Sequence, residues 1–474
     1  MKIFNTMTRS KEEFVPMVAG HVKMYACGPT VYDFFHLGNA RPFITFDALR
    51  RYLEYSGYTV EFCQNFTDID DRMISRANQE GISVRELADR YIAEYYEDAD
   101  KLHILRPTYQ PRATDTIDEI IDMIRILIEK GYAYEIEDGV YYDVSKFERY
   151  GCLSHMNLED LREGASDRIM QSEDKQSAVD FVLWKKKKEG EPAWDSPWGE
   201  GRPGWHIECS AMIRKFLGKT IDVHCGGQDL VFPHHENEIA QSEAANDAPF
   251  VHYWMHNGFI NIDNEKMSKS TGNFFTIRDI VKKFSYEVIR FFILSAHYRM
   301  PINFSSDQLI AAGNGLERIS NSVMNLRFVG SNTERAVTLE DKEAAIVLTE
   351  AMTTAIDAFM QAMDDDLNTA DAVSAIFDLV RAANTACTQT GIPSALLLQA
   401  ADRISELTSV LGIAVDDQEK RSSDIPDSVM TLVSRRTDAK KARDFALSDE
   451  LRDQVTALGY EIKDTAQGPQ VTKR

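Results

Sequence analysis

The stretch HVKMYACGPTVYDFFHLGNA, His21–Ala40, predicts how this chain folds. It opens with polar and apolar residues in alternation, which is typical of a β-strand. A His-Leu-Gly-Asn turn follows, and apolar residues then recur at helical spacing from Phe43 to Leu53. A second apolar run, Thr59–Phe66, completes a strand–turn–helix–strand unit. Units of this kind bind nucleotides beyond the carboxyl ends of their strands.

Two short motifs indicate where a triphosphate would bind. His36, Gly38 and Asn39 open the predicted helix, and a helix N-terminus offers free amides and a positive dipole end to phosphate. Far downstream, the string KMSKS supplies Lys266 and Lys269 on a glycine-bearing loop, which suits a flexible clamp. Alone, each motif is more often a solvated loop or a plain turn. Together they predict ATP used to make an adenylate, with pyrophosphate as the leaving group.

A second constellation offers ligands for a metal. His234 and Glu238 are four residues apart, which puts both on one face of a helix. Cys27 ends the first predicted strand, and we expect Cys209 to end another within the sheet-type run Gly204–Cys209. If these strands are parallel neighbours, both thiols lie at the sheet edge that binds the nucleotide. The residue types suit zinc, but the spacing is not that of a zinc finger. A polar helix face with two buried cysteines is the plainer alternative.

Composition limits the class of protein. The 474 residues are 43% hydrophobic and 27% charged, as expected for a globular chain of about three domains. We expect no transmembrane helix, because no run reaches ~18 apolar residues. We expect a cytoplasmic protein, because the start lacks the apolar core of a secretory signal. Six irregularly spaced cysteines then favour reduced thiols or metal ligands over disulfides.

The net charge of −22 argues against nucleic acid, since phosphate contacts need Lys and Arg. A local basic surface can still bind within an acidic chain. The candidates are Lys185–Lys188 and the basic stretch formed by Arg435, Arg436, Lys440, Lys441 and Arg443. For both, a merely solvated surface is at least as good an interpretation.

Changes in composition and in the spacing of apolar residues along the chain predict an α/β fold class. A Rossmann-type parallel-sheet domain with an insertion is followed by a helical bundle and a small C-terminal domain. The expected boundaries are 1–106 and 200–262 for the two halves of the Rossmann domain, 107–199 for the connective insertion, 263–306 for the KMSKS region, 307–415 for the bundle and 429–474 for the C-terminal domain.

The motifs belong to longer strings in a fixed order: CGPTVYDFFHLGNAR, NFTDIDD, GWHIECSAM, HCGGQDLVFPHHENEIAQS, KMSKSTGNFFT and SAHYR. Together these strings closely resemble the bacterial cysteinyl-tRNA synthetases, a class I aminoacyl-tRNA synthetase family. The resemblance implies a monomer that activates L-cysteine with Mg²⁺ and ATP. Cysteine would then pass from the adenylate to the 3′ end of tRNA(Cys). Residues 263–306 would contact the tRNA stem, and residues 429–474 would recognise the anticodon.

The resemblance also implies roles for single residues. One zinc ion would be held by Cys27, Cys209, His234 and Glu238, and the substrate thiolate would be a further ligand. A pocket without a metal separates near-isosteres such as cysteine and serine by only ~10². The matched ATP positions are His36, Gly38, Asn39, Gly226, Gly227, Asp229, Lys266 and Lys269, of which His36, Asn39, Lys266 and Lys269 would assist catalysis. The matched cysteine positions are Cys27, Thr67, Trp205, Asp229 and His234.

The sequence departs from the family pattern at two points, and two alternative functions compete with the synthetase. Asn39 replaces a second histidine, and no aromatic residue follows Tyr460, where the family often has one that stacks on the anticodon. One alternative is a binding protein on a synthetase fold, which the intact lysines and zinc ligands oppose. The other is a ligase that passes activated cysteine to an amino-sugar, which the residues after the bundle oppose. Zinc content and acceptor choice separate these alternatives from the synthetase.

Overall fold

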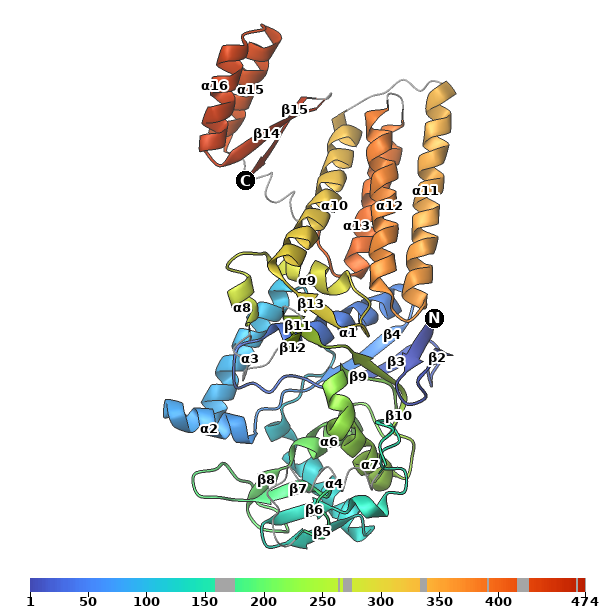
Figure 1. Cartoon of the computed structure of the whole chain (residues 1–474), viewed down its shortest axis with the longest axis vertical. Helices are drawn as coiled ribbons and strands as arrows, with labels where there is room; N and C mark the ends of the chain where they lie inside the picture. Colours follow the sequence, from blue (N-terminus) through green and yellow to red (C-terminus); the bar gives the residue numbers. More distant parts are fainter. Residues whose placement is uncertain are drawn as a thin grey trace. The chain divides into compact units, whose positions relative to one another are not determined.

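The computed structural model describes residues 1–157, 175–262, 265–266, 275–332, 339–389, 392–415, 426–465 and 468–473. The chain divides into two compact units, Met1–Leu309 with Ala362–Ala370, and Ile310–Gln361 with Asp371–Arg474. The first is α/β and the second is mainly helical (Figure 1). The predicted fold class is therefore confirmed. Within the described ranges, no helix has the length and apolar character needed to cross a bilayer.

A four-stranded parallel sheet forms the centre of the first unit, in the order β10–β9–β3–β4. Because all four strands are parallel, their carboxyl ends share one edge of the sheet. Strand β9 is buried at successive residues from Ile221 to Gly226, so both faces of the sheet are covered. The strands are β3 (His21–Ala26), β4 (Thr59–Gln64), β9 (Ile221–Gly227) and β10 (Val251–Asn257).

Helix α1 (Leu37–Tyr55) joins β3 to β4 and begins at the predicted turn. Its apolar residues between Phe43 and Leu53 are buried, as their helical spacing predicts. The other helices around the sheet are α2 (Asp71–Glu80), α3 (Val84–Lys101), α4 (Ile117–Glu129), α6 (Trp205–Phe216) and α7 (Glu236–Asn246). An N-terminal hairpin of β1 (Lys2–Asn5) and β2 (Ser10–Glu13) precedes them.

The insertion forms an antiparallel sheet that shares its core with the Rossmann domain. Buried Trp184 of this sheet belongs to the same hydrophobic cluster as Ile213 of α6 and Trp254 of β10. The insertion is therefore packed onto the domain rather than tethered to it. The strands are β5 (Ala133–Ile136), β6 (Gly139–Tyr142), β7 (Phe181–Lys186) and β8 (Gly201–Pro203).

A small sheet ordered β12–β11–β13 follows the Rossmann domain. It leads into α10 and the second unit, where the described C-terminal piece has its own core around Val433, Val455 and Ile462. The small sheet and its helices are β11 (Ile260–Ile262), β12 (Glu265–Lys266), α8 (Ile277–Ile280), α9 (Tyr286–Leu294) and β13 (Ile302–Phe304). The later elements are α10 (Ser306–Asn332), α11 (Leu339–Asp364), α12 (Thr369–Thr388), α13 (Ser394–Val410), α15 (Asp427–Lys441), α16 (Phe445–Ala457), β14 (Tyr460–Thr465) and β15 (Gly468–Lys473).

Candidate active site

Most of the predicted substrate residues lie at the carboxyl edge of the parallel sheet. Cys27 directly follows β3, Gly226 and Gly227 end β9, and Thr67 lies in the loop after β4. The loops after β3 and β4 run side by side through a parallel bridge between Thr30 and Thr67. This edge is where the order of an open α/β sheet places ligands.

The predicted position of Cys209 at the end of a strand is wrong. Cys209 lies in α6, which begins at Trp205 after the N-cap Gly204. The helix is buried at every residue from Ile207 to Ile213, so its sequence has no polar face that would reveal a helical period. The thiol nevertheless reaches the sheet edge, where its Sγ lies 4.0 Å from that of Cys27.

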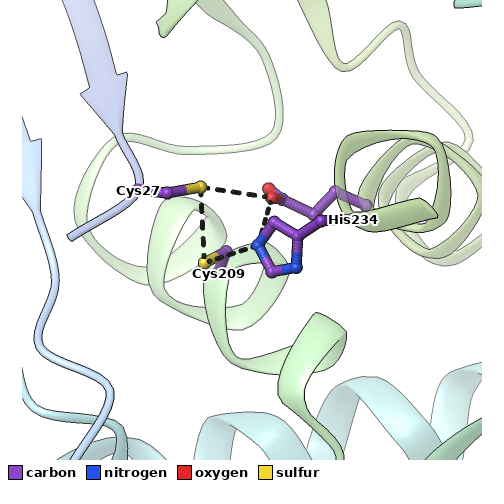
Figure 2. A group of neighbouring side chains, drawn as sticks. Cys27, Cys209 and His234 are labelled. Atoms are coloured by element: carbon purple, nitrogen blue, oxygen red, sulfur yellow. Dashed lines mark hydrogen bonds and ion pairs between the residues drawn. The ribbon is translucent and has the colours of Figure 1, made fainter. Parts of the chain in front are cut away.

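Four side chains predicted as metal ligands converge at this edge. Figure 2 shows the thiols of Cys27 and Cys209 and the imidazole of His234 pointing toward one another. The Sγ atoms are 4.0 Å apart, and Cys209 Sγ lies 3.6 Å from His234 Nε2. Glu238 Oε1 closes the group, 3.0 Å from His234 Nε2 and 3.6 Å from Cys27 Sγ. Tetrahedral zinc with bonds of ~2.0–2.3 Å separates its ligand atoms by ~3.3–3.8 Å, so these spacings fit zinc.

A second set of possible metal ligands overlaps the first. His224 and His235 form it with Cys27 and Glu238, and its ligand atoms also lie within 4.8 Å of one another. His224 Nε2 is 2.9 Å from the other carboxylate oxygen of Glu238, which fixes the plane of the carboxylate. On the opposite side, His206 Nδ1 is 2.9 Å from Nδ1 of His234. Such outer contacts orient metal ligands and set which imidazole nitrogen carries the proton.

Burial and hydrogen bonds shift the pKa values of the four side chains. The hydrogen bond with Cys27 lowers the pKa of Cys209 to about 6, and burial raises the pKa of Cys27. Burial would lower the pKa of His234, but hydrogen bonds with Cys209 and Glu238 raise it to about 10. Burial likewise opposes ionisation of Glu238, yet interaction with His224 lowers its pKa to about 2. The protonated imidazole of His234 thus stabilises a thiolate and a carboxylate away from water, and a divalent metal bound by this group would displace the imidazole proton.

Residues predicted to contact the amino acid surround this group. The Trp205 ring is 43% exposed and lies over His234, with ring centroids 4.2 Å apart. Thr67 is buried, and its hydroxyl donates to Glu208 Oε2 at 3.1 Å. Gly226 makes room for the site, because a Cβ there would lie 2.6 Å from the imidazole carbon of His235.

The phosphate signature forms the first turn of α1. His36 is the N-cap, and its Nδ1 accepts a hydrogen bond from the backbone N–H of Asn39 at 3.2 Å. The proton of a neutral His36 is then on Nε2. A cavity of about 100 Å³ lies against this turn and is lined by His36, Asn39 and Arg72, among others. Asp229 is exposed in the turn Gln228–Leu230 after β9.

The KMSKS string lies largely outside the described residues. Lys266 is the last residue of β12, which pairs with β11. Lys269 falls outside the described ranges. The chain resumes at Phe275, and the backbone at Thr276 forms a bridge with that at His36.

Several lysines and arginines of the two basic candidates are paired. Lys185, Lys186 and Lys187 form ion pairs with Asp71, Glu135 and Glu200, respectively. In the basic stretch of the C-terminal piece, Arg436 is buried, and both terminal nitrogens donate to Asp464 at 2.7 Å. Lys440 also pairs with Asp464, whereas Arg435, Lys441 and Arg443 are exposed.

Sequence reasoning missed His224, His206 and Glu208 as partners of the site. One signal was available for His224, because it is a polar residue in the continuously buried strand β9. Buried polar side chains need partners, and here the partner is Glu238. The contacts of His206 and Glu208 depend on how α6 meets the sheet, which no spacing in the sequence encodes.

Comparisons with known proteins show the family to which this chain belongs. The model of the family described as "tRNA synthetases class I (C) catalytic domain" matches residues 13–314, and a DALR domain matches residues 358–415. The cysteine–tRNA ligase of Caldicellulosiruptor saccharolyticus is 53% identical over 474 residues, covering both chains completely. The chain belongs to the cysteine–tRNA ligase family. The ligase of Clostridioides difficile is also 53% identical, covering 99% of both chains.

Solved structures support the fold independently. A Mycobacterium tuberculosis methionyl-tRNA synthetase in complex with methionyl-adenylate is similar with a TM-score of 0.60. The match covers 83% of this chain and 90% of that one at 14% identity, so it speaks for the fold alone. The family predicted from the strings is therefore confirmed, while the roles of single site residues stay predictions.

Proposed function

We propose that the chain activates L-cysteine with ATP and Mg²⁺ as cysteinyl-adenylate and transfers cysteine to the 3′ end of tRNA(Cys). Membership of the family supports the two-step reaction. The choice of amino acid rests on one observation, the buried group of two thiols, an imidazole and a carboxylate at the nucleotide edge of the sheet. This set is unsuited to Mg²⁺ or Ca²⁺, which prefer oxygen ligands.

We propose that Cys27, Cys209, His234 and Glu238 hold one zinc ion. This set is preferred to the overlapping one with His224 and His235, because it supplies two sulfur ligands and leaves His224 to orient the carboxylate. A zinc ion held there would offer the substrate a Zn–thiolate bond of ~2.3 Å, which the hydroxyl of serine matches poorly.

The chemical step is proposed to need no protein nucleophile. The cysteine carboxylate oxygen bonds to the α-phosphorus of ATP, and the bond from that phosphorus to the bridging oxygen breaks to release pyrophosphate. Negative charge develops on the phosphates in the transition state. Hydrogen-bond donors and cations that are already in position therefore provide most of the rate enhancement. The first turn of α1 offers the positive end of its helix dipole to the phosphates, and its N-cap residue His36 would contact a phosphate oxygen. The adenylate is then attacked by the terminal ribose hydroxyl of tRNA.

Lys269→Ala should lower the rate of adenylate formation far more than it weakens cysteine binding. Loss of one contact to charge that develops in the transition state costs ~10²–10³ in rate. In cysteine-dependent ATP–pyrophosphate exchange, kcat should fall by this factor while KM for cysteine stays close to wild type. Lys283→Ala, an exposed lysine elsewhere in the first unit, is the control. An unchanged exchange rate in Lys269→Ala would remove Lys269 from the mechanism.

The C-terminal piece is proposed to bind the anticodon. It carries the exposed cations Arg435, Lys441 and Arg443, and the aromatic ring of Phe445, 62% exposed, begins α16 beside them. Single-stranded RNA is bound by such combinations, with bases stacked on aromatic rings and phosphates on nearby cations. Phe445 would take the place of the terminal aromatic residue that this chain lacks.

Phe445→Ala should therefore weaken tRNA charging without affecting cysteine activation. Stacking of one base is worth ~1–3 kcal/mol, so kcat/KM for tRNA should fall by roughly 10-fold. Leu458→Ala removes another exposed apolar side chain from the same piece and should leave charging unchanged. Equal, small effects of both substitutions would show that Phe445 does not stack on the anticodon.

ATP–pyrophosphate exchange with each of the twenty amino acids, followed by charging of total tRNA, tests the proposed function. Exchange with cysteine and charging of tRNA are expected. Absence of exchange would favour the binding protein without catalysis. Exchange with cysteine but transfer to an amino-sugar instead of tRNA would favour the other ligase.

A further inference from the structure

Arg41 is a buried cation that binds only main-chain oxygen atoms among the described residues. It lies in α1 just after the phosphate signature, and 1% of its surface is exposed. Its Nη1 donates to the carbonyl of Phe259 at 2.5 Å, and its Nη2 donates to the carbonyls of Tyr298, at 2.9 Å, and Met300. Arg41 forms no ion pair with a carboxylate in the part of the chain that the structure describes. Burial lowers the pKa of Arg41 to about 10, so it remains charged at neutral pH.

Stability alone does not explain this arginine. A buried cation without a counter-charge costs desolvation free energy that an apolar side chain of the same size would avoid. The planar guanidinium, however, can bind several carbonyls at fixed angles, which neither lysine nor an apolar side chain can do. The role of Arg41 therefore depends on which segments of the chain carry those three carbonyls.

The carbonyls belong to the segments that lead into the small sheet. Phe259 immediately precedes β11, whereas Tyr298 and Met300 precede β13. Strand β11 pairs with β13 on one side and with β12 on the other, and β12 ends at Lys266. Arg41 thus ties the strand that carries the first KMSKS lysine to the helix that carries the phosphate signature.

The opposite end of the lysine segment, which we define as residues 266–276, meets the same turn through the main chain. The N–H of Leu37 donates to the carbonyl of Phe275 at 3.3 Å, and the N–H of Ile277 donates to that of Phe35 at 2.9 Å. Both ends of the lysine segment are therefore fixed relative to the first turn of α1. Among the contacts of the described residues, a side chain of α1, that of Arg41, contributes at the end near Lys266.

The SAHYR string, Ser295–Arg299, holds one of the carbonyls that face Arg41, that of Tyr298, and Met300 follows the string directly. Its Tyr298 hydroxyl donates to Asp366 Oδ1 at 2.7 Å, and Arg299 Nε donates to Asp366 Oδ2 at 2.7 Å. Asp366 is buried and also accepts from the backbone N–H of Phe4 at 2.8 Å. The side chains of Tyr298 and Arg299 thus fix the main chain at this point, so that the Tyr298 carbonyl and that of the following Met300 meet Arg41 in a fixed geometry.

We propose that Arg41 is a positioning residue for adenylate formation, which holds β11, and through it β12 with Lys266, in place relative to the phosphate signature. The inference rests on the proposed role of Lys269 at the ATP phosphates. Arg41 does not itself touch the substrate; it acts through the lysines. Loss of Arg41 should therefore remove most of what Lys269 contributes to the reaction.

A double-mutant cycle tests this coupling. In exchange assays, Arg41→Lys should lower kcat by ~10-fold to 10², the cost of misplacing a catalytic group by about 1 Å. It should leave KM for cysteine within about 2-fold of wild type, because the amino-acid site is not touched. Lys269→Ala, which costs ~10²–10³ in the wild-type background, should cost less in the Arg41→Lys background by about the factor that Arg41→Lys itself costs, so the double variant should be about as slow as Lys269→Ala alone.

Arg290→Lys is the matched control. Arg290 is also fully buried and donates to a carbonyl, that of Leu102 at 2.9 Å, and to Asp47, away from the small sheet. In its background the full cost of Lys269→Ala should remain. If Arg41→Lys does not fold, Gly258→Ala perturbs the same contact from the other side, because a Cβ there would lie 2.7 Å from the carbonyl oxygen of Arg299 and 2.9 Å from Met300.

The outcomes separate the inference from the proposed function. Full, multiplicative costs of Lys269→Ala in the Arg41→Lys background, or in the Gly258→Ala background where that replaces it, would show that Arg41 is only structural. No effect of Lys269→Ala in wild type would instead overturn the proposed role of the lysine and, with it, the basis for Arg41.

Discussion

Cys209→Ser should release the zinc ion and remove most cysteine activation. Structural zinc sites gain ~10–16 kcal/mol from four ligands, so each ligand carries ~3–4 kcal/mol, or ~10²–10³ in zinc affinity. In the molecules that keep zinc, the altered ligand set would also distort the coordination of the ion to which the substrate thiolate binds. We therefore expect cysteine-dependent exchange to fall by at least ~10³, the product of lost zinc and impaired chemistry.

Two measurements check this result independently. Metal analysis of the purified variant should give far less than one zinc per chain, whereas wild type should give one. Exchange with serine should fall much less than exchange with cysteine. The ratio of the two exchange rates should therefore fall toward the ~10² that a metal-free pocket achieves. Cys63→Ser is the control, since Cys63 is fully buried on the neighbouring strand β4 but is not among the four proposed ligands. A wild-type protein that is zinc-free and fully active would refute the zinc proposal.

The architecture around the nucleotide edge followed from local patterns in the sequence. The alternation in His21–Ala26 and the helical spacing after Leu37 are properties of single elements, and each buries the face that its pattern predicts. The order of strand, turn, helix and strand then allows few topologies, because parallel crossovers have one hand. The position of Cys27 at the sheet edge follows from this order of elements alone.

Other parts of the site depend on tertiary contacts that no local pattern encodes. The middle of helix α6, Ile207–Ile213, is buried at every residue, so Cys209 appeared to belong to a strand. His224 and Glu238 are a hydrogen-bonded pair because β9 and α7 meet in the fold, and His206 reaches His234 for the same kind of reason. The number of basic residues in the basic stretch likewise does not tell which of them are held by a carboxylate within the protein. Arg436 is a structural partner of Asp464, so only the exposed cations nearby remain for RNA.

Deletion of residues 429–474 should separate the two half-reactions. The proposed activation residues all lie in the first unit, whereas the deleted piece belongs to the second and has a core of its own around Val433 and Val455. Its removal should not expose the core of the catalytic unit. We expect cysteine-dependent exchange to stay within about 2-fold of wild type, since the groups that set the rate are untouched.

Charging of tRNA by the truncated enzyme should fall by ~10³ or more, because a base stack and several phosphate contacts are lost together. The salt dependence identifies the cause. Three exposed cations, Arg435, Lys441 and Arg443, should contribute ~2–3 to the slope of log affinity against log salt, and the truncation should remove that part. A triple substitution of these residues with alanine should reproduce the change in slope in the full-length chain, with exchange unaffected. If the truncated enzyme charged tRNA normally, the C-terminal piece would not be an anticodon module, and transfer to a smaller acceptor such as an amino-sugar would become the better account of the second half-reaction.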